Sequence, residues 1–188
     1  QELLMVCAAH DIDCYVDGMG VEVLDMLRGY PDFLRDADAL DRAARHARTV
    51  TGRDGQRKRI AAQNTVIVTT SGMLAGGPAM TYIPEIRTDP TNRISLTGYQ
   101  VEGTPGRELL ETGRCELNGG VRPVAAQTAL FDFSAHADRD GLRSFLDTYE
   151  EATVLVNHGD NCEGFAAELR DEGVAASAPG VGDDCTVG

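Results

Sequence analysis

Short β-branched runs recur along the sequence, and each leads through a polar or glycine-containing turn into a stretch with helical spacing. Strands are expected at 14–16, 65–70, 93–97, 129–133 and 153–156. Strands that alternate with helices usually pair in parallel, because each helix returns the chain to the starting edge of the sheet. The sequence therefore predicts an α/β fold built on parallel strands.

Other segments give more local expectations. Residues 35–50 are rich in Ala, Asp and Arg at helical spacing and predict a helix, and residues 52–56 predict a polar loop. The continuous run of apolar and β-branched residues at 65–70 predicts a strand that is buried on both faces. Residues 115–127 predict a hairpin with its turn at Asn118-Gly119-Gly120. This change from alternating strands and helices to a hairpin predicts a domain boundary between about residues 112 and 128.

The charge is unusual, since 30 acidic residues against 17 basic ones give −13, and Lys58 is the one lysine. Such a surface either repels polyanions or reflects adaptation to a cytosol of molar salt. At about 1 M salt the Debye length falls to roughly 3 Å, so only charges in contact still act on each other. The acidity therefore does not exclude a nucleic acid, and the lack of lysine favours adaptation to high salt.

Two further features of the sequence bear on the cellular compartment of the protein. No apolar run approaches the roughly 18 residues that a membrane-spanning helix needs, and the start of the chain lacks a signal-peptide pattern. The five cysteines are odd in number and never spaced as C-x-x-C, which fits neither a disulfide framework nor a zinc ribbon. We expect a soluble cytoplasmic protein with no membrane partner and with reduced, mostly buried cysteines.

Two of the four histidines, His136 and His158, occupy equivalent positions just after an expected strand and before an expected helix. In open α/β sheets this edge is where ligands bind, and helix N-termini favour anions. Each histidine taken alone is more often a loop or capping residue than a catalytic one, but the repeated context shifts the balance towards function. A neutral imidazole binds zinc, and a protonated one can donate a proton to a leaving oxygen. His10 and His46 lack this context and are expected on helix surfaces.

Carboxylates lie beside both histidines. Asp132 and Asp138 flank His136, and either could orient its ring. For Asp138 the favoured alternative is an N-cap of the following helix. Asp160 could likewise be a cap or a solvated turn residue.

Glycine-rich turns at 17–20, 71–77 and 98–106 could present backbone N–H groups to phosphates. The simpler alternative is a set of tight turns between strands and helices, because neither a dinucleotide fingerprint nor a P-loop is complete. The candidate phosphate- or RNA-contacting residues are Ser71, Gly72, Gly103, Thr104 and Ser134.

Several blocks together resemble the β-CASP nucleases of the metallo-β-lactamase fold, particularly archaeal relatives of the cleavage-and-polyadenylation endonuclease. The blocks are Gln1-Glu2-Leu3-Leu4, Gly72-Met73 with Gly76, Gly98-Tyr99 through Glu102-Gly103-Thr104, Phe133-Ser134-Ala135-His136-Ala137-Asp138, and Val156-Asn157-His158-Gly159. The resemblance implies a Rossmann-like, parallel-sheet β-CASP domain at 1–120. It also implies that residues 121–188 are the C-terminal strands and helices of a metallo-β-lactamase αββα domain.

The resemblance further implies a zinc-dependent ribonuclease of the kind that processes mRNA 3′ ends. In that family two zinc ions activate a water that attacks the RNA phosphodiester in line. His136 is implied to contact the scissile phosphate and act as general acid. His158 is implied to ligate one zinc ion, and a histidine at this position points to RNA as the substrate. Asp160 departs from the glutamate that many relatives have there, which leaves its role open.

The resemblance also implies that something is missing. Family members carry an H-x-H-x-D-H cluster and further ligands in an N-terminal catalytic half, and this sequence begins after them. We therefore expect a fragment that is inactive alone, with an exposed apolar face that could drive homo-oligomerisation. The alternatives are a non-catalytic RNA-binding or scaffold homologue of a cleavage complex and, disfavoured by the missing phosphate motifs, a nucleotide-binding α/β domain.

Overall fold

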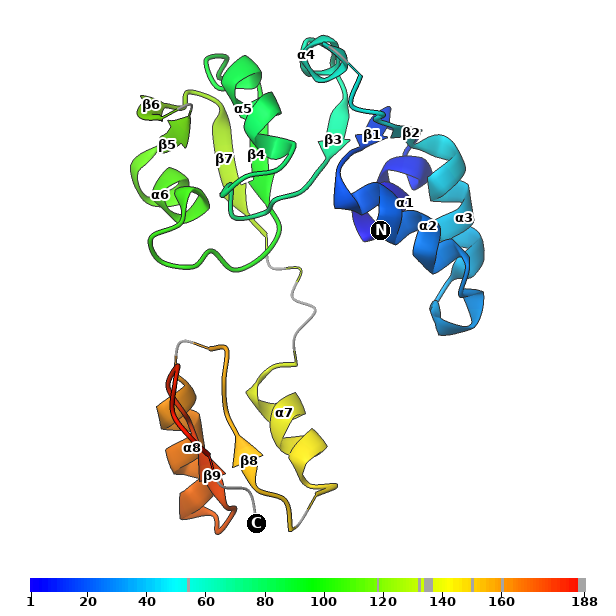
Figure 1. Cartoon of the computed structure of the whole chain (residues 1–188). Helices are drawn as coiled ribbons and strands as arrows, with labels where there is room; N and C mark the ends of the chain where they lie inside the picture. Colours follow the sequence, from blue (N-terminus) through cyan, green and yellow to red (C-terminus); the bar gives the residue numbers. More distant parts are fainter. Residues whose placement is uncertain are drawn as a thin grey trace. The chain divides into compact units, whose positions relative to one another are not determined.

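Parallel strand pairs form the framework of the chain in a computed structural model (Figure 1). The chain divides into two compact units, Gln1–Ser134 and Ala135–Gly188, and each is described by itself. The structure describes residues 1–53, 55–117, 119–131, 133, 137–149, 151–159 and 161–185.

The first sheet of unit 1 has the strand order β2-β1-β3, and both pairings are parallel. Its strands are β1 (Cys14–Val16), β2 (Arg48–Thr49) and β3 (Val66–Val68). The helices that precede or connect them are α1 (Glu2–Ala9), α2 (Met19–Arg28), the 3-10 helix Pro31–Phe33, α3 (Ala37–His46) and α4 (Gln56–Ala61). The helices α1 and α3 pack against each other, and Leu4, Val16 and Leu40 lie in their shared core. Apolar residues at helical spacing bury one face of each helix against this core.

Three local expectations for this region are confirmed only in part. The predicted helix at 35–50 ends at His46, because residues 48–49 extend to pair with β1. The predicted polar loop at 52–56 is confirmed at Gly52, Arg53 and Gly55, and α4 begins at its last residue, Gln56. The strand at 66–68 is not buried on both faces, since Val66 is 38% exposed at the edge of the sheet. A three-residue edge strand has one neighbour only, so an apolar run there does not imply burial.

A second sheet of unit 1 pairs β4 (Arg93–Leu96) with β7 (Gln127–Leu130) in parallel. An antiparallel hairpin of β5 (Arg114–Leu117) and β6 (Gly120–Pro123) lies between them in sequence, which confirms the expected antiparallel pair. The connecting helices are α5 (Ala79–Ile86) and α6 (Pro105–Thr112). Their buried residues meet in one core that includes Ile83, Leu96, Leu109 and Cys115.

Unit 2 is smaller. It contains α7 (Arg139–Leu146), β8 (Val154–Leu155), α8 (Cys162–Asp171) and β9 (Ala176–Ser177). The strands β8 and β9 pair in parallel, and α8 packs on β9 through Ala166 and Leu169. The helix α7 has no buried residue, and its Phe145 is 60% exposed with its ring 5.1 Å from the ring of Tyr149.

The α/β class and the parallel pairing are thus confirmed, although the strands form several small sheets. Strand β7 follows residue 120 yet pairs with β4 of unit 1, so the compact units divide later than the boundary expected from sequence. The division of the chain into family domains at residue 120 stays a prediction. None of the described helices is long and apolar enough to cross a membrane.

Candidate functional site

His158 lies three residues after β8 and four before α8, as the sequence predicted. Its backbone has a φ of 62°, in the left-handed region that residues other than glycine rarely adopt. The residue is exposed, and no hydrogen bond or ion pair joins its side chain to the described residues. Such backbone strain persists only where the surroundings impose it, and it occurs often at functional sites. The imidazole is therefore available to a ligand.

Four other candidates, Asp132, Ser134, His136 and Asp160, lie outside the described residues. Their proposed roles stay predictions. Asp138 is described, and it is the N-cap of α7: its carboxylate accepts a hydrogen bond of 2.8 Å from the backbone N–H of Gly141. This is the capping role that sequence offered as the alternative to orienting His136.

The structure brings together the two glycine turns that hold Ser71, Gly72, Gly103 and Thr104. The backbone N–H of Gly106, at the start of α6, donates to the carbonyl of Met73 at 2.9 Å. Thr104 is held within its own turn, since its hydroxyl donates to the carbonyl of Val101 at 2.6 Å. Gly72 and Gly103 are exposed. These turns thus meet at the carboxyl ends of β3 and β4, where a phosphate could approach.

Gln100 fixes one of these turns from inside. It is 3% exposed, and its side-chain amide nitrogen donates to the carbonyls of Gly98 and Tyr99 at 2.9 and 3.3 Å. A Cβ atom on Gly106 would lie 2.0 Å from the Gln100 Oε1 atom, so a larger residue at position 106 would displace the Gln100 amide. The turn is therefore held by a buried amide and by close packing.

Asp17, directly after β1, forms a buried network that the sequence interpretation missed. Its side chain is 1% exposed and accepts hydrogen bonds from Arg57 Nε at 2.7 Å and from Arg57 Nη2 at 3.0 Å. The Tyr82 hydroxyl donates to it at 2.7 Å, and so does the backbone N–H of Gly18. One carboxylate thereby joins β1, α4 and α5.

The protonation of this network follows from its contacts. Burial alone would raise the pKa of Asp17, but the hydrogen bonds from Arg57, Tyr82 and Gly18 outweigh it and hold the pKa below its ordinary value. Burial, followed by the bond to Asp17, raises the pKa of Tyr82. Asp17 is therefore an ionised group with its donors already in place. Its two oxygens accept four hydrogen bonds from the protein itself, so we expect Asp17 to stabilise the fold and not to bind a ligand.

A signal for this network was present in the sequence. An aspartate directly after the apolar run Cys14-Tyr15-Val16 is expected to be buried or to lie at the sheet edge, and a buried carboxylate needs a cationic partner. What sequence could not provide was the partner, because Arg57 lies 40 residues away.

The cysteines show no catalytic arrangement. All those described are free, and Cys7, Cys14 and Cys115 are buried. Burial raises the pKa of the Cys14 thiol to about 11, so the reactive thiolate is scarce near neutral pH. The expected role of most of them as small buried hydrophobes fits these positions.

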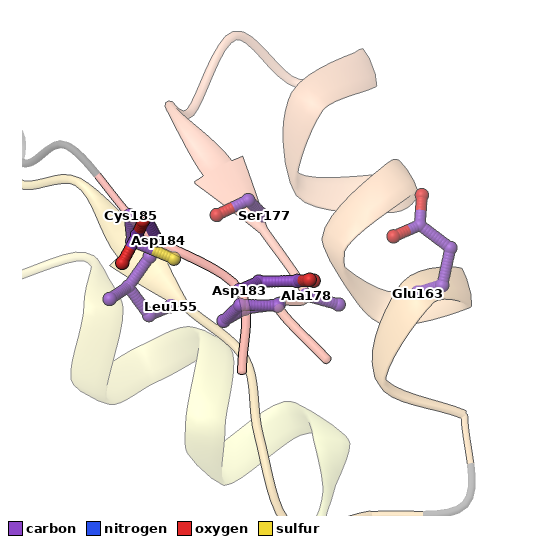
Figure 2. A pocket seen from close by; sticks show the side chains of 8 residues that line it. Leu155, Glu163, Ser177, Ala178, Asp183, Asp184 and Cys185 are labelled. Carbon is purple, nitrogen blue, oxygen red and sulfur yellow. The ribbon is translucent and has the colours of Figure 1, made fainter. Parts of the chain in front are cut away.

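A pocket of about 530 Å³ lies in unit 2 (Figure 2). Its lining includes the carboxylates of Glu163, Asp183 and Asp184, with the hydroxyl of Ser177. His158 does not line it. Three carboxylates would repel a phosphate at short range, so this pocket gives no support to RNA binding.

The described residues do not complete a zinc site. A catalytic zinc ion usually has three protein ligands and a water. Within the described ranges no group of three His, Cys, Asp or Glu side chains could hold a metal. His158 fits as one ligand, because its imidazole is exposed and held in no other contact there. The remaining ligands would have to come from outside the described residues.

Comparison with known proteins identifies both parts of the chain. Residues 3–109 match the Beta-Casp domain, and residues 121–179 match the domain described as the Zn-dependent metallo-hydrolase RNA specificity domain. The chain therefore belongs to the β-CASP family of metallo-β-lactamase-fold proteins.

Curated relatives align along most of the chain. A protein of Saccharolobus solfataricus named "RNase aCSPSF2" is 33% identical over 100% of this chain, and a Methanocaldococcus jannaschii protein named "Probable RNase MJ4" is 30% identical over 87%. A Thermococcus kodakarensis protein named "Transcription termination factor FttA" is 27% identical over 95%. The chain spans 39% of the length of the first two relatives and 32% of the third.

Proposed function

We propose that this chain is part of a zinc-dependent ribonuclease that hydrolyses RNA phosphodiester bonds in RNA processing, of the mRNA 3′-end kind. The observation that carries the proposal is the ordered match to a Beta-Casp domain and then to an RNA specificity domain. Two relatives that align with most of the chain are named as RNases. Because the chain spans 39% of those relatives, the activity belongs to the whole protein.

His158 is the proposed zinc ligand within this chain. Its exposed imidazole and strained backbone at the end of β8 support that role. Bound zinc would supply a water with a lowered pKa as the nucleophile. His136, in the segment between β7 and α7, is the proposed general acid, which would protonate the leaving oxygen of the cleaved RNA.

The proposal extends to the parts of the whole protein that lie outside this chain. Two zinc ions, held mainly by residues outside this chain, would complete the site, and the chain alone would be inactive. The exposed apolar residues of α7, such as Phe145, would pack against the rest of the protein or against a second copy. The acidic, lysine-poor composition supports function in a cytosol of high salt.

The experiment uses the full-length protein with labelled single-stranded RNA, zinc and high KCl. His136→Ala is expected to slow cleavage by about 10²- to 10⁴-fold, the usual contribution of a general acid. His158→Ala is expected to slow cleavage and to weaken zinc binding. His10→Ala is the matched control, because His10 is an exposed residue at the end of α1. Unchanged cleavage in either of the first two variants would defeat the role assigned to that residue.

A non-catalytic scaffold of a cleavage complex is the competing function. The presence of both His136 and His158 favours the nuclease, since a scaffold has no chemical need for them. The sequence upstream of this chain in the full-length protein distinguishes the nuclease from the scaffold. An H-x-H-x-D-H cluster there supports the nuclease, and its absence supports the scaffold.

A further inference from the structure

The segment around α4 is strongly basic in an otherwise acidic chain. Four of the chain's 17 basic residues, Arg53, Arg57, Lys58 and Arg59, lie within seven positions, with Asp54 as the one acidic residue among them. The chain as a whole has a net charge of −13. A local excess of positive charge in such a background is a candidate contact surface for a polyanion.

The fold places this segment at the carboxyl edge of the first sheet. Strand β2 ends at Thr49 and runs parallel to β1, and the backbone N–H of Val50 donates to the Val16 carbonyl. The loop that begins at Thr51 therefore leaves the sheet at the same edge as Asp17. The Gln56 side chain holds this loop, since its Oε1 accepts from the backbone N–H of Thr51 at 3.0 Å.

Two guanidinium groups lie against glycines of this loop. A Cβ atom on Gly52 would lie 3.4 Å from Arg57 Nη2, and a Cβ atom on Gly55 would lie 3.3 Å from Arg59 Nη1. The absence of side chains at Gly52 and Gly55 lets both guanidinium groups approach the loop backbone. Charged donors from α4 are thus gathered around one loop.

The ion pairs divide the four cations into two kinds. Arg57 is fixed by Asp17, and the Lys58 ammonium lies 3.2 Å from a Glu85 carboxylate oxygen. Arg53 and Arg59 are exposed, and no carboxylate in the described part of the chain pairs with either. Their charges are therefore uncompensated by described neighbours. Guanidinium groups suit phosphates, because their planar donors can bind two phosphate oxygens together.

We propose that Arg53 and Arg59 form a contact surface for the phosphate backbone of single-stranded RNA. The proposal rests on the proposed ribonuclease function, and it adds a binding surface in the β-CASP part, made of residues other than those assigned to catalysis. Arg57 acts as a positioning residue, since its bonds to Asp17 hold α4 on the sheet edge. The surface holds the RNA strand and takes no part in the chemistry.

The test measures binding of a fluorescein-labelled single-stranded RNA to the full-length protein by fluorescence anisotropy, across KCl concentrations at which circular dichroism is unchanged. The double variant R53Q/R59Q is compared with R35Q/R42Q, which removes two exposed arginines of the same unit near and within α3. Both variants lose the same charge. We expect R53Q/R59Q to weaken binding about tenfold and to lower the slope of log Kd against log salt by about 1.4, from roughly 0.7 for each lost contact to a single strand.

The control R35Q/R42Q is expected to change both quantities far less. Equal effects of the two double variants would overturn the proposal and leave the ribonuclease function standing, provided that the parent protein cleaves RNA. A parent that neither binds nor cleaves RNA would overturn both. A labelled polyglutamate peptide that binds the parent as tightly as RNA, and loses binding in R53Q/R59Q, would assign the surface to an acidic protein and overturn the RNA proposal.

Discussion

Asp17 follows strand β1 and His158 follows strand β8, and both strands pair in parallel. The two side chains differ in burial and in hydrogen bonding. Asp17 is 1% exposed and is bonded by Arg57, Tyr82 and the Gly18 backbone. His158 is exposed, has a left-handed backbone, and makes no hydrogen bond to the described residues. A polar residue at the end of a strand can therefore serve the fold or a ligand. Whether its hydrogen-bonding capacity is already used by the protein separates the two.

The largest effect on stability is expected from Asp17→Ala. Removing one partner of a buried ion pair leaves Arg57 and the Tyr82 hydroxyl without their acceptor, which costs about 3–5 kcal/mol of the free energy of unfolding. Denaturant titration followed by circular dichroism measures the change. Asp25→Ala, on the exposed face of α2, is the matched control and should stay within about 0.5 kcal/mol of the parent.

The same carboxylate gives a pH dependence. Its pKa in the folded state is depressed, so its contribution to stability is complete above its unfolded pKa of about 3.9 and is lost as the pH falls through the lower folded pKa. The difference in unfolding free energy between the parent and Asp17→Asn should therefore shrink as the pH falls below about 4. If the difference in unfolding free energy between the parent and Asp17→Asn stays constant down to the pH of acid unfolding, then the negative charge of Asp17 does not contribute to stability.

Tyr82→Phe is expected to have the next largest effect. The substitution keeps the ring in its buried position but removes the hydroxyl that donates to Asp17 at 2.7 Å. A hydrogen bond to a charged group contributes about 1.5–3 kcal/mol, and the Arg57 bonds remain. Unfolding by denaturant should show a loss in this range. In the background of Asp17→Ala the same substitution should cost much less, because the acceptor is already gone.

Asp138→Ala probes the cap of α7 with a smaller expected effect. The carboxylate that accepts from the Gly141 N–H is lost, at a cost of about 1 kcal/mol. Asp138→Asn keeps an acceptor at the same place and should stay close to the parent. If both variants lose equal stability, the cap geometry is not what the residue supplies.

The smallest effect on stability is expected from His158→Gly. Glycine adopts a φ of 62° without strain, which offsets the larger conformational entropy that glycine gives the unfolded chain. The free energy of unfolding should change by less than about 1 kcal/mol. A loss of several kcal/mol would show that the imidazole is a structural group.

The sequence predicted much of the framework for a physical reason. Periodicity and turn residues are local, so the short strand at 14–16 could be placed closely. The two-residue strand at 48–49 could not, because its conformation depends on pairing with β1, whereas the Ala- and Arg-rich pattern before it favours a continuing helix. Tertiary pairing decided that segment.

The site divides in the same manner. His158 could be placed at a strand end because its context is local, and its exposure agrees with availability to a ligand. The Asp17–Arg57–Tyr82 network could not be found, since its members are joined across 40 and 65 residues. The family blocks supplied roles for His136 and His158, which remain proposals.

The most direct test of this comparison is the zinc affinity of the full-length protein, measured by competition with a chelator for His158→Gly and Asp17→Asn. We expect His158→Gly to bind zinc more than about 100-fold more weakly while it retains its unfolding free energy. Loss of a residue that only hydrogen-bonds to a metal ligand costs about 10- to 100-fold in affinity, so a larger loss indicates a direct ligand. Asp17→Asn should lose stability and keep its zinc affinity under conditions where it is folded. Parental zinc affinity in His158→Gly would contradict the account.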